Sequence, residues 1–509
     1  MSFRGINTTV IQIRRQVFTE VARMAYANVK GEQANHLMRK IPYTIIPGEE
    51  GKLRKDIFLE RAIVEERVRL AMGLPTRRMD EHNSVVSGLE DASIADKYYD
   101  PPLVNVIKFA CNRCPEKLVK VSDLCQGCLA HPCMEVCPKK AITWESGRST
   151  IDQDKCIKCG RCVDVCAYKA INHQKRPCAA ACGMDAIHSD PNGRADIDYD
   201  KCVSCGQCLV NCPFGAIADK SQIFQMIRAI QAGERVYAAV APAFVGQFGP
   251  KVTPGKLRAA MKQLGFADII EVAIGADLCA AQEAEDFVKE VPEKLPFMAT
   301  SCCPAWSVMA KKLFPEQANC ISMALTPMTL TARLIKHHQP GAKVAFIGPC
   351  AAKKLEAMRR TVRSEVDFVL TFEEMAGIFE ARHIDVNTLK EDPHGVNDAS
   401  ADGRNFAVSG GVAQAVVNVI KEKYPDREIK VANAEGLSEC RKLMMMAKAG
   451  KYNGYLLEGM ACPGGCVAGA GTMQSIKKSS VAVNMYAKQA EHQVATGTHH
   501  VAELDKLVD

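Results

Sequence analysis

The chain has 509 residues, a formal net charge of +7, 47% hydrophobic residues and 24 cysteines. That length has room for about three domains with a sizeable core. No stretch approaches the ~20 uninterrupted apolar residues of a membrane span, no apolar run follows Met1, and no basic stripe carries interleaved aromatic residues. So many thiols indicate a reducing, anaerobic compartment. We therefore expect a cytoplasmic protein with no membrane or nucleic-acid partner.

Residues 1–100 carry two amphipathic stretches but no cysteine. Residues 11–27 and 55–73 both repeat apolar positions at helical spacing. The sequence therefore predicts a helical N-terminal region that covers the neighbouring domain or docks a partner.

The region 101–220 is dominated by cysteine rows, because 16 of the 24 cysteines lie between residues 111 and 212. Two rows have the spacing C-x2-C-x2-C-x3-C, namely Cys156, Cys159, Cys162 and Cys166, and then Cys202, Cys205, Cys208 and Cys212. This spacing is typical of ferredoxin 4Fe-4S clusters, in which three thiolates hold one cubane and the fourth serves a neighbouring one. Zinc sites usually separate two CxxC pairs by a dozen or more residues, and disulfide scaffolds belong to short secreted chains. The rows therefore predict iron–sulfur clusters and electron transfer.

The rows pair into two modules, one nested inside the other. The stretched row 125–137 pairs with the row 156–166, which predicts one cubane on Cys125, Cys128, Cys133 and Cys166 and another on Cys156, Cys159, Cys162 and Cys137. The row 202–212 is completed by two cysteine pairs that lie on either side of the inner rows, Cys111 with Cys114 and Cys178 with Cys182. This arrangement predicts one cubane on Cys202, Cys205, Cys208 and Cys182 and another on Cys111, Cys114, Cys178 and Cys212. This nesting resembles the four-cluster subunits of molybdenum oxidoreductases. The alternative is that Cys111 and Cys114 are ordinary buried thiols and only three cubanes form.

The formal charge of +7 is not a sign of nucleic-acid binding once clusters are counted. Each oxidised four-thiolate cubane carries about −2, so four of them bring the loaded protein to roughly zero.

Residues 221–482 alternate short apolar runs with helical stretches, as in residues 235–244, 268–278, 294–303, 343–352 and 454–465. Continuous apolar runs of this length predict buried parallel strands, so this region should be α/β. Cysteines follow several of these runs, and sites in α/β proteins lie beyond the carboxyl ends of the strands. We therefore expect the cysteines to meet in one crevice. The fold class is thus a multidomain α+β and α/β protein, with a nested double ferredoxin module before an α/β domain with parallel sheets.

Three motifs resemble the signatures of the iron-only (FeFe) hydrogenases: TSCCPAW at 300–306, GPCAAKKLE at 348–356 and EGMACPGGCVAGAG at 458–471. The resemblance implies an H-cluster, which is a 4Fe-4S cubane bridged to a di-iron unit bearing CO, cyanide and an azadithiolate. Its cubane ligands would be Cys303, Cys350, Cys462 and Cys466, with Cys466 also bridging to the di-iron unit.

The resemblance also implies a proton path and a set of residues around the di-iron unit. Cys302 would exchange a proton with the bridgehead amine, followed outward by Glu283, Ser322 and Asp286. Without the resemblance, acidic residues on a helix such as 277–290 are usually a solvated face. Lys353 would pair with a cyanide ligand, and the walls that exclude water would be Ala241, Pro242, Pro327 and Met460.

Several positions depart from the better-studied members. Gly348 stands where a methionine packs on the di-iron unit, and Ala243 stands where a serine donates to a cyanide. The other departures are Asp286, Glu290, Ala305 and Met328. These changes resemble the clostridial subgroup called group B. We expect the remaining cysteines, Cys279, Cys320 and Cys440, to be buried thiols, and residues 483–509, with His499 and His500, to form a peripheral helical tail.

The resemblance implies a hydrogenase that reversibly reduces protons to H2. Ferredoxin or a similar protein would carry its electrons, because no GxGxxG fingerprint for a nucleotide is present, and maturation enzymes would insert the di-iron unit. The alternative is a hydrogenase-like redox sensor or iron–sulfur assembly protein without significant H2 turnover. A subunit of an electron-bifurcating complex is a third interpretation.

Overall fold

A computed structural model describes residues 4–359, 362, 364–394 and 398–508. The N-terminal region is helical, as the sequence predicts, with α1 (Thr9–Ala27), α2 (Gly31–Ile45), α3 (Ile57–Ala71) and the short α4 (Leu89–Ala92). The Thr8 side chain caps α1 by accepting from the Ile11 N–H, and the Asp56 side chain caps α3 in the same way. Helix α1 packs against α9 (Ile223–Gln231) and α15 (Phe372–Ala381). Its buried face joins the same hydrophobic core as the α/β region, so the helices are built into the main body of the molecule.

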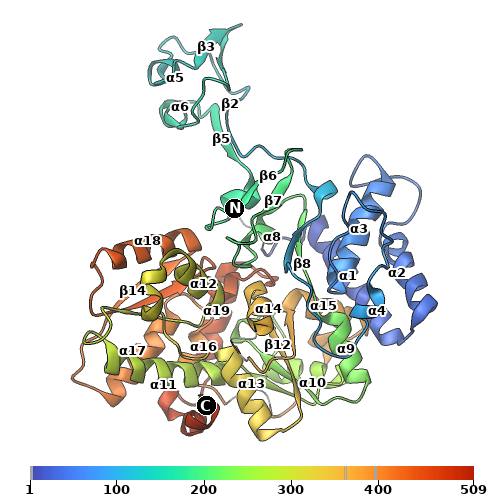
Figure 1. Ribbon diagram of the computed structural model, residues 1–509, viewed down its shortest axis with the longest axis vertical. Coiled ribbons are helices and arrows are strands. Elements are labelled where there is room, and N and C mark those ends of the chain that lie inside the picture. Colours follow the sequence, from blue (N-terminus) through green and yellow to red (C-terminus); the bar gives the residue numbers. More distant parts are fainter. Residues whose placement is uncertain (1–3, 360–361, 363, 395–397, 509) are drawn as a thin grey trace.

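The cysteine-rich region forms an arm that projects from the main body (Figure 1). The module that is inner in sequence, called the inner module, lies at the end of the arm farthest from the body. It is built from β2 (Lys117–Val121), α5 (Pro132–Glu135), β3 (Ile142–Glu145), β4 (Arg148–Ile151), α6 (Arg161–Val165) and β5 (Ile171–Lys175). The outer module, next to the body, contains β1 (Val104–Val106), α7 (Pro177–Ala180), β6 (Ile187–Ser189), β7 (Ala195–Ile197), α8 (Gln207–Asn211) and β8 (Ile217–Asp219).

Strand pairing confirms that one module is inserted into the other. Strand β1 pairs antiparallel with β8, although the whole inner module lies between them in sequence. Strands β2 and β5 pair in the same way within that insertion and form the stem of the inner module.

The main body contains two parallel sheets, as the apolar runs predict (Figure 1). The first has the order β10-β9-β12-β13, with β9 (Val236–Val240), β10 (Asp268–Glu271), β12 (Lys343–Gly348) and β13 (Phe368–Thr371). The second has the order β11-β15-β14, with β11 (Met298–Ala299), β14 (Lys430–Glu435) and β15 (Tyr455–Met460). All of their strand pairs are parallel, so each strand connects to the next through a crossover.

The crossovers contain α10 (Pro254–Leu264), α11 (Ala273–Glu290), α12 (Pro304–Leu313), α13 (Pro327–His338), α14 (Ala351–Met358), α16 (Ala401–Asn405), α17 (Gly411–Lys423) and α18 (Leu437–Lys448). The apolar run 268–278 is not one strand. Strand β10 ends at Glu271 and α11 begins two residues later, because an apolar run can be a buried helix as well as a strand.

The C-terminal stretch is less peripheral than the sequence predicts. The tail was expected to begin at residue 483, but helix α19 (Ile476–Ala487) runs through this position without a break, and α20 (Asp505–Val508) follows it. Ala495 and Leu507 are buried in the core around α11. His499 is exposed, whereas the side chain of His500 is only 13% exposed. No helix among the described residues has the length and apolar character needed to cross a membrane.

Candidate metal centre and active site

One cavity lies between the two sheets, beyond the carboxyl ends of their strands. Cys303 precedes α12, Cys350 follows β12, and Cys462 and Cys466 lie in the loop after β15. All four line this cavity. The four cysteines are spread over more than 160 residues of sequence, and the parallel strands with their crossovers bring them together. This is the convergence that the sequence predicts.

The chemistry of the cavity fits a sulfur-ligated iron cluster. Burial raises the pKa of Cys350 to about 11, and it also raises the pKa of Cys303, Cys462 and Cys466. Each thiolate would further raise the pKa of its neighbours. Four thiolates can therefore coexist here only with a compensating cation, and soft thiolate ligands suit iron–sulfur clusters.

The rest of the cavity is almost entirely apolar. The predicted wall residues all line it, and they are Ala241, Pro242, Pro327 and Met460. The lack of a side chain at Gly348 does not leave empty space in the cavity wall, because the ring of Phe346 fills it. A Cβ at position 348 would meet this ring at 2.5 Å, and Phe346 also lines the cavity. Residues 346 and 348 lie on the same side of β12, so the ring takes space that a larger residue at 348 would use.

Lys353 supplies the positive charge of the cavity. It lies in the first turn of α14, is 8% exposed, and its Nζ lies 2.7 Å from Glu356 Oε2. Burial alone would lower the pKa of Lys353, but the Glu356 carboxylate more than offsets this and raises it. Thr326 Oγ1 donates to the other oxygen of Glu356 at 2.8 Å. Glu356 is a site residue that our sequence reasoning missed, although it ends the second motif one helical turn after Lys353.

A line of polar groups leads from the cavity along α11 toward the surface. Cys302 lines the cavity, and the thiol is close enough to Glu283 for the carboxylate to raise its pKa. Glu283 is fully buried; its Oε1 accepts from the Ser301 N–H at 3.0 Å, and Oε2 has no hydrogen-bond partner. Burial raises the pKa of Glu283 to about 7, although the Ser301 N–H and the nearby Ser322 hydroxyl oppose the shift.

Asp286 continues this line one turn further along α11. It is half-buried, and burial followed by the charge of Glu290 raises its pKa. The structure thus brings together Cys302, Glu283, Ser322 and Asp286. Ser301 was not predicted, because its main contribution is a backbone N–H that no side-chain pattern reveals.

The three leftover cysteines are buried, as expected. Cys279 lies on α11 one turn before Glu283, so both face the interior next to the cavity. Cys320 and Cys440 lie in the core on the other side of the second sheet.

The accessory cysteines also gather largely as the sequence predicts. One small cavity is lined by Cys111, Cys114, Cys178 and Cys212, and another by Cys137, Cys156, Cys159 and Cys162. The thiols of a third group lie close enough to influence one another electrostatically, and they are Cys182, Cys202, Cys205 and Cys208. For the fourth set, Cys125, Cys133 and Cys166 share one apolar cluster, which also contains Cys137, Cys156 and Cys162 but not Cys128.

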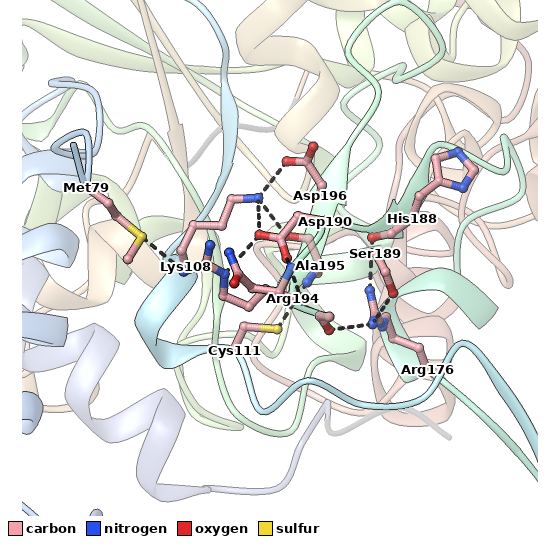
Figure 2. Close-up of polar contacts among 12 residues, drawn as sticks. Met79, Lys108, Cys111, Arg176, His188, Ser189, Asp190, Arg194, Ala195 and Asp196 are labelled. Atoms are coloured by element: carbon pink, nitrogen blue, oxygen red, sulfur yellow. Dashed lines mark hydrogen bonds and ion pairs between the residues drawn. The ribbon is translucent and has the colours of Figure 1, made fainter.

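The grouping of Cys111 and Cys114 with Cys178 and Cys212 favours four cubanes over three. Figure 2 shows the contacts that hold this part of the outer module. The buried Arg176 donates to the Cys114 carbonyl at 2.7 and 2.9 Å, and Cys111 Sγ accepts from the Ala195 N–H at 3.3 Å. Hydrogen bonds to cluster sulfurs stabilise the thiolate form. Arg176 was not predicted either, because most of its partners are backbone carbonyls.

The outer module also touches the active cavity. Cys182, Cys202 and Cys205 pack in the same apolar cluster as Cys303 and Cys350. A cluster at Cys182, Cys202, Cys205 and Cys208 would therefore be the nearest electron donor to the cavity.

Comparison with known proteins agrees with this architecture. Residues 234–470 match the C-terminal domain of the iron-only hydrogenase large subunit. Residues 155–216 match a 4Fe-4S dicluster domain, and residues 125–176 match the LdpA Fe-S cluster-binding domain. The dicluster match takes the rows 156–166 and 202–212 together, whereas the structure divides them between the two modules.

The chain is 29% identical to iron hydrogenase 1 of Clostridium pasteurianum over 438 residues, which cover 73% of this chain and 74% of that protein. It is 26% identical to the cytosolic iron-sulfur assembly component 3 of Bos taurus, over 49% of this chain and 63% of that protein. An FeFe hydrogenase from Chlamydomonas reinhardtii matches 54% of this chain and 89% of its own, at 23% identity and a TM-score of 0.45.

The fold and the cavity define an iron–sulfur protein with a cluster-bearing arm on an α/β body. The match over residues 234–470 and the three motifs that meet in one cavity assign this region of the chain to the iron-only hydrogenase family.

Proposed function

We propose that the protein catalyses the reversible reduction of protons to H2 at an H-cluster. Cys303, Cys350, Cys462 and Cys466 would hold its cubane, with Cys466 bridging to the di-iron unit. When bound, the di-iron unit supplies the iron site at which H2 is made or split. The observation that carries the proposal is that four cysteines, Cys302 and Lys353 line one cavity from which Glu283 leads outward.

In this proposal the protein moves protons and excludes water. Cys302 passes a proton between the cavity and Glu283, and Ser322 and Asp286 continue the path toward solvent. A pKa of about 7 suits Glu283 to this role, because a relay group must gain and lose a proton at neutral pH. The Lys353 ammonium, held by Glu356, would supply the donor for an anionic cyanide ligand. The apolar wall keeps bulk water away from the reacting centre.

Electrons would travel along the arm through four accessory 4Fe-4S clusters. A carrier would meet the inner module, which projects farthest from the body (Figure 1). Large apolar side chains are exposed on this module next to the cysteines, and they include Leu124, Leu129, Trp144, Ile157 and Tyr168. Such side chains suit a transient contact with a ferredoxin-type protein. We further propose that the protein works in the cytoplasm and receives its di-iron unit from maturation enzymes.

The second candidate is a hydrogenase-like protein that works in iron–sulfur assembly or redox sensing without H2 turnover. The 26% identity to an iron-sulfur assembly component is the observation that favours it. Against it stands the proximity of Cys302, Glu283 and Ser322 beside the cavity, which cluster assembly does not need.

An H2-evolution assay separates the two candidates. Protein produced together with the maturation enzymes should evolve H2 from a reduced dye, and Cys302→Ala should do so about 10²–10⁴-fold more slowly. If the matured protein evolves no more H2 than this variant, the assembly or sensor function is the better interpretation.

A further inference from the structure

Arg4 lies far from the active cavity in sequence but reaches the loops around it in space. The Arg4 Nε donates to the Gly469 carbonyl at 3.2 Å, and Nη2 donates to Gln207 Oε1 at 3.3 Å. Its side chain is buried, with 9% exposure for the whole residue. Gly469 follows Cys466 by three residues, and Gln207 lies between Cys205 and Cys208. One N-terminal arginine thus binds both the active-site loop and the outer cluster module.

Gln207 continues this contact to a sulfur atom. Its Nε2 donates to Cys462 Sγ at 3.1 Å, so the side chain accepts from Arg4 at one end and donates to Cys462 at the other. A guanidinium on the amide oxygen polarises the amide and strengthens the bond that its N–H group makes. Gly206, the preceding residue, has no room for a Cβ against Ala470 and Ala351, so the turn that presents Gln207 is pressed against the active-site loops.

Two other arginines show that the N-terminal region repeats this kind of contact. Arg54 donates to the carbonyls of Ala110 and Phe214, and Arg67 donates to the Gly215 carbonyl. These carbonyls flank Cys111 and Cys212. Of the three arginines, Arg4 is the one connected to a sulfur of the active cavity.

We propose that Arg4, acting through Gln207, is a positioning residue that raises the reduction potential of the cubane at Cys303, Cys350, Cys462 and Cys466. An electron that arrives from the neighbouring accessory cubane adds one negative charge to this centre and oxidises the donor by one electron. A buried guanidinium and a hydrogen bond to a ligand sulfur both stabilise the added charge, because the surrounding cavity is apolar. The inference rests on the proposed H-cluster, and it makes the N-terminal segment a working part of that site.

The test is infrared spectroelectrochemistry on the full-length matured protein. The CO and cyanide bands shift when the adjoining cubane gains an electron, so they report its oxidation state without an activity assay. In Arg4→Gln the ratio of reduced to oxidised cubane at a fixed potential should fall roughly tenfold, which is the effect of losing one charge-assisted hydrogen bond. Arg4→Lys should restore part of the loss because it keeps the charge. Gln207→Met, similar in size but without a donor, should reproduce the fall with Arg4 intact.

The matched control is Arg23→Gln, which removes an exposed arginine of α1 that pairs only with Glu20 in its own helix. It should leave the ratio unchanged. The inference is overturned if Arg4→Gln and Gln207→Met both titrate like the parent, or if Arg23→Gln shifts the ratio as much as Arg4→Gln does. Failure of the proposed function is distinguishable, because the parent itself would then show no CO or cyanide bands, or bands that do not respond to H2. If Arg4→Gln does not fold, the Gln207→Met and Arg4→Lys titrations decide the matter.

Discussion

Cys302 and Cys303 are adjacent in sequence, yet we assign one to proton transfer and the other to iron. Both line the cavity, and Cys303 is the residue directly before α12. Cys303→Ala removes a thiolate ligand, so the H-cluster should fail to assemble or be unstable. Cys302→Ala leaves the four ligands in place, so iron content and the CO and cyanide bands should persist while turnover falls about 10²–10⁴-fold. Iron analysis and infrared spectra of the two variants check this. Parental turnover in Cys302→Ala would contradict the mechanism, and loss of its cluster would mean that the two roles are exchanged.

Glu283 is the next residue on the proposed path. Glu283→Gln keeps the size of the side chain but cannot exchange a proton at a useful pKa, so turnover should fall strongly while the resting infrared bands stay nearly unchanged. The half-buried Asp286 is the natural comparison, and Asp286→Asn should have a weaker effect because water can replace it near the surface. Equal turnover in Glu283→Gln and the parent would mean that protons enter by another route.

The burial of Glu283 also predicts a pH dependence of stability. Its pKa is raised from 4.5 to about 7, so the folded state binds this proton more tightly than the unfolded state does. The stability that this group contributes is therefore present below pH 4.5 and lost as the pH rises to about 7. The amide of Glu283→Gln cannot ionise here, so the unfolding temperature of this variant should rise relative to that of the parent between pH 5 and pH 7. Above pH 7 the difference between the two should change little. A difference that stays constant over this range would contradict the raised pKa.

At the scale of the elements, local patterns predict much of the architecture. Strands β9, β12 and β15 follow from apolar runs, and the cysteine rows follow from their spacing. Strand β14 was not predicted, because half of its residues are polar and all of them are half-exposed or exposed. Glu356, Ser301 and Arg176 were missed for other reasons. Ser301 and Arg176 act largely through backbone groups, which residue type and spacing do not reveal, whereas Glu356 pairs with Lys353 three residues away and could have been found from that spacing.

The nesting of the two modules gives a prediction at the same scale. Cys111 enters the outer module only because β1 pairs with β8 around the inserted inner module. Cys111→Ser should therefore cost about one cubane, roughly four irons per chain, and leave the other accessory clusters intact. Iron analysis with electron paramagnetic resonance of the reduced protein checks this. An unchanged iron count would favour the three-cluster alternative, with Cys111 and Cys114 as ordinary thiols.

The whole molecule consists of a cysteine-rich arm, which we propose carries electrons, on a body that holds the candidate active cavity. The fully matured chain should contain about 22 irons, of which about 16 belong to accessory cubanes. The structure suggests the order of transfer: the inner module lies farthest out, and the group of Cys182, Cys202, Cys205 and Cys208 lies against the cavity (Figure 1). From the sequence, the N-terminal helices could only be assigned a covering or docking role. In the structure they share the core of the body, and arginines of the N-terminal region bind the loops that carry cluster cysteines.

The central claim is that this cavity holds an H-cluster that turns over H2. The measurement that tests it most directly is the infrared spectrum of protein produced with the maturation enzymes, recorded under argon and then under H2. We predict CO and cyanide bands, which have no other source in such a protein, and we predict that H2 shifts them as the cluster is reduced. Protein with its full iron–sulfur content that shows no such bands after maturation, or bands that do not respond to H2, would contradict the account.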